Sequence, residues 1–102
     1  MFRGVNKILA WPEPVDMRKS FNGLLGLVKH SLKEDPLSGS LFVFVNRRGT
    51  LLKSIYWDRT GYCLFAKRLE SGRFLIPGKG KQEISETTLK LILDGVRLVH
   101  GM

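Results

Sequence analysis

Cysteine and histidine are scarce in this sequence, which contains one cysteine and two histidines. A single cysteine excludes an internal disulfide framework and a multi-cysteine zinc site. Cys63 lies in the apolar run Tyr62–Phe65, where we expect a buried, unreactive thiol. His30 and His100 are far apart and have no cysteine or acidic residue at ligand spacing, so we expect neither a metal site nor a cofactor.

Long apolar runs are also missing. Charged residues or glycine interrupt every apolar stretch well before the roughly 20 residues that cross a bilayer. Residues 1–10 show no hydrophobic core followed by a small-residue cleavage site, so they do not read as a secretory signal. We therefore expect a cytoplasmic protein without a membrane partner, folded as a single domain over residues 1–102.

Positive charge is what the sequence has in excess. There are 17 Lys and Arg against 9 Asp and Glu, a net charge of +8. Residues 47–81 alone hold nine basic and two acidic side chains, so nearly all of the excess lies in the central third. Charge concentrated on neighbouring strands creates a local potential that attracts a polyanion.

The first part of the chain predicts a short strand and a helix. The strand is expected at Lys7–Trp11, before Pro12. From Asp16 onward, apolar residues recur at three- and four-residue spacing as far as Leu32, which predicts an amphipathic helix. Asp16 is the expected N-cap, because a short carboxylate accepts hydrogen bonds from the first turn.

The middle and end of the chain predict a sheet and a second helix. Four short segments rich in β-branched and aromatic residues are separated by tight-turn signals: Leu41–Asn46, Leu51–Asp58, Tyr62–Leu69 and Arg73–Ile76. Strands joined so briefly are antiparallel. Ser85 is expected to cap the second helix. The predicted fold is α+β, an antiparallel β-meander sheet of about four to five strands with two main helices packed against it, in the simplest arrangement on one face.

The basic side chains of the meander are the candidate nucleic-acid contacts, because cations bind phosphate oxygens. They are Arg47, Arg48, Lys53, Arg59, Lys67, Arg68, Arg73, Lys79 and Lys81. Tyr56 and Trp57 could stack on bases or anchor a protein interface, and the alternative is that both rings belong to the core. Several of the charges could equally serve only to solvate the surface. Of the adjacent Lys67 and Arg68, at least one should reach solvent on the face away from the helices, unless an acid such as Glu70 or Asp58 pairs with it.

Enzymatic interpretations find less support. The segment Gly78–Lys81 lacks the glycine spacing and the following Ser or Thr of a phosphate-binding loop. A metal-dependent nuclease using Asp16, Asp58 and Glu70 remains an alternative. Each of these acids, however, has a simpler expected role: helix cap, turn residue and ion-pair partner respectively.

Several motifs in order along the chain point to one family. They are Pro14–Lys19, Phe42–Phe44 with Asn46–Gly49, Tyr56–Leu64, Lys67–Glu70 and Gly72–Phe74. In these segments the sequence resembles the accessory TnpB protein, encoded by the second open reading frame, of the insertion-sequence-66 family. The resemblance runs from about residue 14 to residue 77, and the tail Leu89–Gly95 also fits. Ser20 departs from the glycine expected after Asp16–Lys19, which concerns helix packing more than function.

This resemblance implies a non-catalytic bacterial protein that works in DNA transposition beside a separate, larger transposase carrying the catalytic acids. It does not imply the RNA-guided nuclease that shares the TnpB name, which is several times longer. Two hypotheses follow for the molecular role. The protein either binds DNA through a basic β-sheet surface or is an adapter that docks onto the transposase or another accessory subunit, and its oligomeric state is left open.

Overall fold

The fold is a five-stranded sheet with one helix on each face, and it is described here from a computed structural model over residues 4–96. The strands are β1 (Ile8–Trp11), β2 (Leu41–Val45), β3 (Leu51–Asp58), β4 (Gly61–Arg68) and β5 (Gln82–Ile84). The helices are α1 (Phe21–His30) and α2 (Glu86–Leu93). The α+β class, the five strands and the two helices confirm the prediction from sequence.

The sheet order is β4-β3-β2-β1-β5, and the sheet is mixed. Strands β2, β3 and β4 form the expected antiparallel meander, joined by two tight turns. Strand β1 pairs in parallel with β2, because α1 carries the chain across one face between them. Strand β5 pairs antiparallel with β1 and forms one edge of the sheet.

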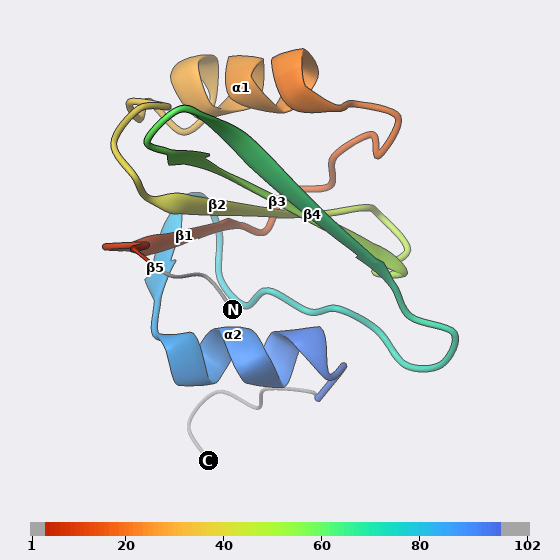
Figure 1. Cartoon of the computed structure of the whole chain (residues 1–102). Helices are drawn as coiled ribbons and strands as arrows, with labels where there is room; N and C mark the ends of the chain where they lie inside the picture. The colour runs from red at the N-terminus through yellow and green to blue at the C-terminus, as the bar shows by residue number, and fades with distance from the viewer. Residues whose placement is uncertain (1–3, 97–102) are drawn as a thin grey trace.

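The two helices cover opposite faces of the sheet, not the single face expected from sequence (Figure 1). Leu24 and Val28 of α1 pack on Phe42, Phe44 and neighbouring side chains of one face. On the other face, α2 is held by a second set of buried residues: Leu41, Val43, Leu52, Phe74, Leu89, Ile92 and Leu93. All five residues of β2 are buried as a result. A strand covered on both sides buries apolar side chains at every position.

The N-terminus of one helix is capped as the sequence predicts, and that of the other is not. Ser85 caps α2 as expected, and its Oγ accepts a hydrogen bond of 3.0 Å from the Thr88 backbone N–H. The expectation for Asp16 was wrong, because α1 begins at Phe21 and follows Ser20. Asp16 lies in the segment before the helix, where its carboxylate binds Arg18 instead.

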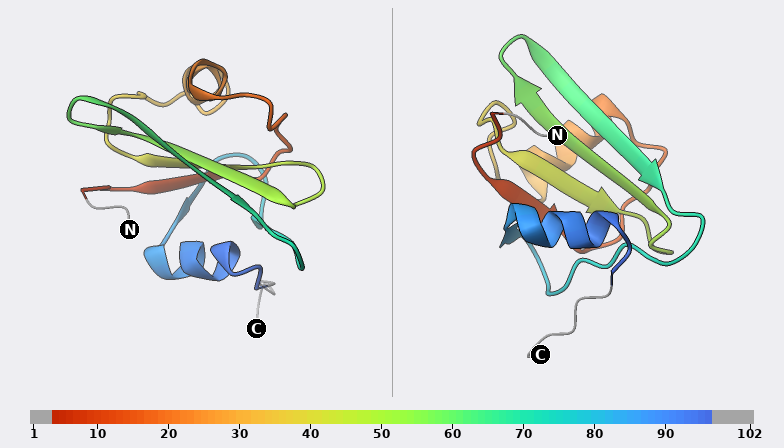
Figure 2. Two further views of the ribbon diagram at one scale, coloured as in Figure 1. Left: turned by 45° about the vertical axis from the view of Figure 1, so that its right-hand side comes forward. Right: turned by 60° about the horizontal axis from the view of Figure 1, so that its bottom comes forward.

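One further local prediction was wrong, and one strand was missed. Residues 73–76 form no strand, although the Phe74 side chain is buried. The strand that completes the sheet is β5, for which the sequence predicted no element. The segment 69–81 crosses the molecule from the end of β4 to β5, which lies at the opposite edge of the sheet (Figure 2).

Candidate nucleic-acid interface

The turn between β2 and β3 presents two arginines from a fixed backbone. The Asn46 side-chain oxygen accepts hydrogen bonds from the backbone N–H groups of Thr50, at 2.9 Å, and Leu51, at 3.0 Å. The Asn46 amide nitrogen donates to the Thr50 hydroxyl at 3.0 Å. Arg47 and Arg48 occupy the two middle positions of this turn and are exposed. Their Cα positions are therefore set by the Asn46 network, while the guanidinium groups extend into solvent.

A third arginine is brought to the same place by Gly49. The Gly49 backbone has a φ of 72°, in the left-handed region that favours glycine. Its carbonyl oxygen accepts a hydrogen bond of 2.7 Å from the Phe74 backbone N–H. The exposed Arg73 is thereby placed beside the turn, where it shares the lining of one surface hollow with Arg47 and Arg48.

Arg18 approaches the turn from the segment that precedes α1. It lines a second hollow, which adjoins the first and is also lined by Arg47 and Arg48. Asp16 holds Arg18 in place, because the guanidinium donates to both carboxylate oxygens, at 2.7 Å to Oδ2 and 3.1 Å to Oδ1. These hydrogen bonds and that from the Arg18 backbone lower the pKa of Asp16 from 3.8 to about 2. The pKa of Arg18 is raised by the same contact.

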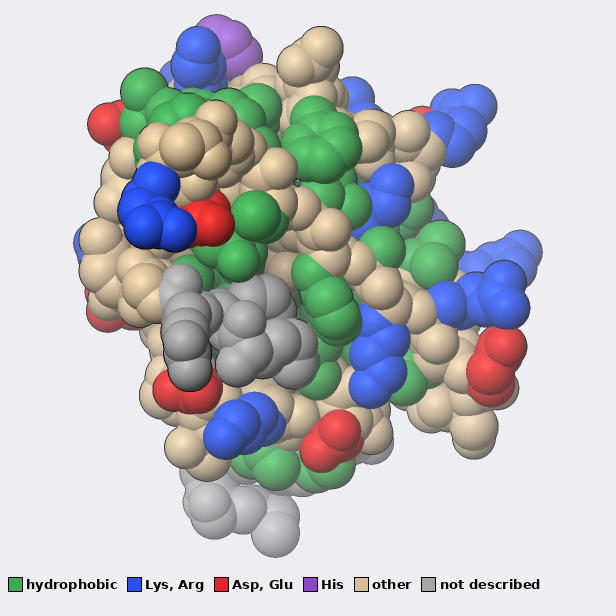
Figure 3. All heavy atoms as spheres, viewed as in Figure 1, with side chains coloured by type: hydrophobic (Ala, Val, Ile, Leu, Met, Phe, Trp, Pro, Cys, Tyr) green, Lys and Arg blue, Asp and Glu red, His purple; other side chains and the backbone are tan. Residues whose placement is uncertain are grey.

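We call this group the arginine end of the sheet: Arg18, Arg47, Arg48 and Arg73. Within residues 4–96, Arg47, Arg48 and Arg73 have no carboxylate partner, whereas Arg18 is paired with Asp16. Figure 3 shows Lys and Arg side chains gathered along the right-hand side of the molecule, the side to which the β2–β3 turn points in Figure 1. The charge pattern does not predict Arg18, because this residue lies outside residues 47–81, although it belongs to the motif Pro14–Lys19.

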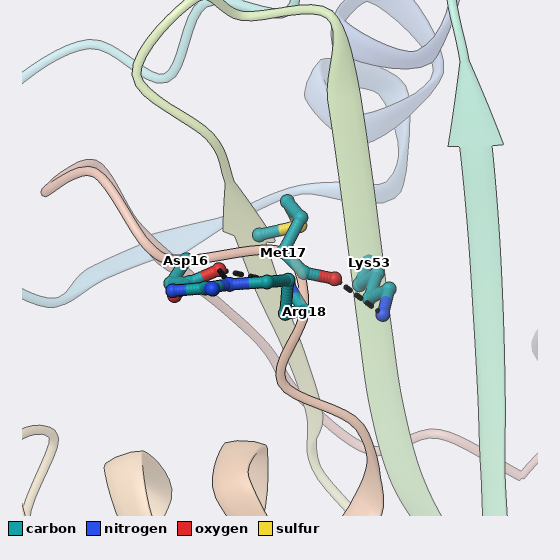
Figure 4. A network of polar contacts seen from close by, with 4 residues as sticks. All are labelled: Asp16, Met17, Arg18 and Lys53. Atoms are coloured by element: carbon teal, nitrogen blue, oxygen red, sulfur yellow. Dashed lines mark hydrogen bonds and ion pairs between the residues drawn. The ribbon is translucent and has the colours of Figure 1, made fainter.

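Two of the nine candidate cations are used inside the protein. The Lys53 ammonium donates to the backbone carbonyl oxygens of Met17, at 2.8 Å, and Lys19, at 2.7 Å (Figure 4). On the other face, the Lys67 ammonium donates at 2.8 Å to the carbonyl oxygen of Leu93, at the end of α2. A cation at a helix C-terminus satisfies an orphan carbonyl and complements the helix dipole. Both lysines therefore stabilise the connections of the fold.

Three more candidates have acidic neighbours. Arg68 pairs with Glu70 at 3.0 Å, as expected for an arginine near that acid, and Lys81 forms an ion pair with Glu34. Arg59 lies 3.8 Å from Asp58 and occupies the β3–β4 turn, at the far end of β3 from the arginine end. An eight-residue strand separates these two turns by about 25 Å. The nine cations therefore do not form one continuous patch.

Lys79 and the two aromatic candidates complete the set. Lys79 lies exposed in the loop before β5, and its carbonyl oxygen accepts a hydrogen bond from the Gln82 side chain at 2.6 Å. Trp57 is half-buried and packs edge-on against Tyr62, with ring centroids 5.0 Å apart. Tyr56 is half-buried on the opposite face, where a hydrogen bond with Cys63, and then burial, raise its pKa. Neither aromatic side chain lines the hollows of the arginine end.

The three acids of the nuclease alternative do not meet. Asp16, Asp58 and Glu70 each pair with an arginine two residues away or closer, and Asp58 lies at the opposite end of β3 from Asp16. Over residues 4–96, no three His, Cys, Asp or Glu side chains are grouped so that they could hold a metal ion. In the same part of the chain, no helix has the length and apolar character needed to cross a membrane.

Comparison with known proteins gives a family. The sequence matches the family described as "IS66 Orf2 like protein" (TnpB_IS66) over residues 6–101. It is 39% identical over 92 residues to uncharacterized protein y4jC of Sinorhizobium fredii, an alignment that covers 88% of this chain and 79% of y4jC. It is 46% identical over 87 residues to uncharacterized protein y4hO of the same organism, covering 83% of this chain and 76% of y4hO. No solved structure matches. The chain belongs to the IS66 Orf2-like family of transposition accessory proteins.

Proposed function

We propose that this protein is a non-catalytic accessory factor of insertion-sequence-66-type transposition that binds DNA through its arginine end. The observation that carries the proposal is the grouping of Arg47, Arg48 and Arg73 around one hollow, each exposed and without a carboxylate partner within residues 4–96. Guanidinium groups bind phosphate oxygens through two parallel hydrogen bonds. The fixed turn lowers the entropy that would otherwise be lost when these groups are positioned on a phosphate backbone.

The charge of the site favours contact with phosphates over the reading of bases. Arginines at a surface turn position a protein on the DNA backbone, whereas sequence is read by an element that enters a groove. Asp16 lines one hollow of the arginine end, and its charge is already neutralised by Arg18. We therefore expect binding that depends weakly on DNA sequence and strongly on salt.

Arg68, Lys79 and Lys81 lie outside the lining of the two hollows, and Arg68 and Lys81 each pair with an acid, so we assign these three only a contribution to the positive potential. Arg59 would reach only a separate stretch of DNA, because it lies about 25 Å away. Lys53 and Lys67 contribute to the general positive potential while their ammonium groups bind backbone carbonyls.

Chemical-shift mapping by NMR tests the location of the contact. Addition of a short DNA duplex at low salt should shift the side-chain Nε–Hε signals of Arg47, Arg48 and Arg73, together with the backbone amides of residues 46–49 and 73–74. The Nε–Hε signal of Arg59 serves as an internal comparison within the same sample. Shifts confined to Arg59, or no shift at all, would reject the arginine end as the DNA site.

The second candidate function is that of an adapter, which would use a different part of the molecule. Trp57 and Tyr56 were its expected anchors, but both side chains are half-buried and they lie on opposite faces of the sheet, so they do not form one anchor. The feature that favours docking is the outer edge of β4, which is distinct from the arginine end. The transposase of the same element is the partner that we propose for an adapter role.

A further inference from the structure

Strand β4 is a long strand at the edge of the sheet. Within residues 4–96, no strand pairs with its outer side, whereas its inner side pairs with β3 over eight consecutive residues. The other edge strand, β5, is only three residues long and presents Gln82 and Glu83. Short, polar edge strands are protected against further pairing, and long edge strands are not.

The register shows which backbone groups of β4 point outward. The Leu69 backbone N–H donates to the Thr50 carbonyl oxygen at 2.9 Å, in line with the pairing of Arg68 with Leu51. Hydrogen-bonding direction alternates along a strand, so the odd-numbered residues of β4 direct their N–H and C=O groups toward β3. The even-numbered residues, Tyr62, Leu64 and Ala66, direct theirs away from the sheet.

Over most of its length this edge lacks the devices that normally prevent strand addition, and its charged side chains, Lys67 and Arg68, stand only at its C-terminal end. Residues 62–66 include no charged side chain and no proline, and the pairing with β3 contains no bulge. Charged residues, proline and bulges are the usual means by which edge strands avoid pairing with another chain. The turn end of the β3–β4 hairpin also extends beyond α2 (Figure 2, right), so the helix does not cover this end of the edge strand.

A side-chain pocket adjoins the same edge. It lies between β4 and α2, has a volume of about 200 Å³, and is lined by Phe65, Lys67, Lys90, Leu93 and Asp94. Its lining residues are two apolar side chains, two lysines and one aspartate. Lys67 keeps its hydrogen bond to the Leu93 carbonyl oxygen, and Lys90 is exposed on α2. A glutamate side chain matches this lining, with its methylene groups against Phe65 and Leu93 and its carboxylate near the lysines.

We propose that the outer edge of β4 binds an extended peptide segment of a partner protein, which adds a sixth strand and places a glutamate side chain in the pocket between β4 and α2. Peptides that add to a sheet edge gain affinity from backbone hydrogen bonds and specificity from pockets for alternate side chains. The inference does not depend on DNA binding, because the arginine end lies elsewhere on the molecule.

Charge argues against a second copy of this chain as the occupant. In an antiparallel pair of β4 strands, the turn end of one copy meets the C-terminal end of the other. Arg59 of one copy would then lie near Lys67 and Arg68 of its neighbour at both ends of the pair. The nearby acids Asp58 and Glu70 already face arginines of their own copy. A peptide that carries a single glutamate and no cation meets no such repulsion.

Hydrogen exchange with a synthetic peptide tests the proposal. The probe is a capped ten-residue peptide of alternating valine and threonine with one central glutamate, and the comparison peptide carries lysine in place of glutamate. Binding of the glutamate peptide should slow exchange of the Tyr62, Leu64 and Ala66 amides about ten-fold or more, without protecting Arg47 or Arg48. The glutamate peptide should bind about two- to five-fold more tightly than the lysine peptide.

Two variants test separately whether the peptide binds the outer edge of β4 and whether its glutamate enters the adjoining pocket. Ala66→Pro removes an outward N–H that β3 does not use, so it should abolish peptide protection while DNA binding persists, and Ala66→Ser should bind as the parent does. Lys90→Glu keeps the strand intact and should reverse the preference in favour of the lysine peptide, which covers the case in which the proline variant fails to fold. No protection by either peptide, an unchanged preference in Lys90→Glu, or protection that rises with protein concentration alone, as for a second copy, would overturn the proposal.

Discussion

The Phe74 backbone N–H donates a hydrogen bond of 2.7 Å to the carbonyl oxygen of Gly49, and this contact joins two segments that are 25 residues apart in sequence. One segment is the β2–β3 turn, which carries Arg47 and Arg48. The other follows β4 and carries Arg73. Because the contact is between backbone groups, it fixes the spacing of the arginines without using any of their charge. The proposed DNA site is therefore a product of turn geometry as much as of composition.

Gly49→Ala should damage this junction. A Cβ at residue 49 would lie 3.0 Å from the Phe74 carbonyl oxygen, and the φ of 72° is unfavourable for alanine. We expect a loss of about 2 kcal/mol in the free energy of unfolding, measured by urea denaturation. Gly26→Ala is the matched control, because its Cβ would meet nothing within 4 Å inside α1. That variant should gain up to about 1 kcal/mol, and equal losses in both would contradict the strain argument.

Lys53→Met should lower stability and leave the proposed DNA contact in place. The substitution keeps an apolar stem but removes the donor to the Met17 and Lys19 carbonyl oxygens. We expect a loss of about 1–2 kcal/mol in the free energy of unfolding, from thermal or urea denaturation. DNA affinity should fall no more than for removal of an exposed lysine elsewhere, such as Lys29. A large, selective loss of affinity with unchanged stability would show that Lys53 contacts DNA instead.

Ser54→Ala should leave stability unchanged or raise it by up to about 1 kcal/mol. The Ser54 hydroxyl is buried and has no hydrogen-bond partner among the described residues. A buried polar group without a partner loses its hydrogen bonds to water on folding and gains no hydrogen bond within the protein. Ser40→Ala is the comparison, because the Ser40 hydroxyl, also buried, donates to the Asn6 side-chain oxygen at 3.3 Å. Ser40→Ala should lower the melting temperature, and a similar drop for Ser54→Ala would disprove this account of Ser54.

The Asp16 pair should make stability depend on pH in the acid range. The pKa of Asp16 in the folded protein is about 2, below its ordinary value of 3.8. Between these values the unfolded chain binds more protons, so the contribution of the pair is complete above about pH 5 and is lost as pH falls toward 2. The difference in melting temperature between the parent and Asp16→Asn should shrink over this range.

Carboxyl titration by NMR provides the direct check on Asp16. The midpoint should be depressed in the parent and return toward the ordinary value in Arg18→Met, because Arg18 is the main cause of the shift. An ordinary midpoint in the parent would mean that the Arg18 contact is not maintained in solution.

The meander could be predicted from sequence because its signals are local. The Asn46–Gly49 and Asp58–Gly61 turns lie between β-rich segments, and β3 has the bounds expected from those turns. Strand β5 could not be predicted, since Gln82–Ile84 is too short and polar to signal a strand, and it forms only because β1 offers a free edge. The covering of both faces did leave a signal. Five consecutive apolar residues in β2 indicate a strand buried on both sides.

The sequence predicted that cations would form the candidate site, but it did not predict which of these cations would be available to bind DNA. Nine cations stood out, but sequence does not show which of them bind backbone carbonyls. Lys53 and Lys67 do so over separations of 26 or more residues, and a carbonyl acceptor leaves no mark in the side-chain pattern. Arg18 joins the site only because the segment before α1 returns to the β2–β3 turn, where the Val15 backbone N–H binds the Val45 carbonyl oxygen at 2.9 Å.

The central claim is that DNA is bound by three arginines at one place, and the salt dependence of affinity tests it most directly. Fluorescence anisotropy with a labelled duplex compares the parent with Arg47→Gln/Arg48→Gln/Arg73→Gln and with Lys7→Gln/Lys29→Gln/Lys33→Gln, which removes the same charge elsewhere. We predict that log affinity falls against log salt with a slope of about −3 in the parent and the lysine variant, and that the arginine variant loses most of this slope. Equal slopes in the two triple variants, or no binding by the parent, would contradict the account.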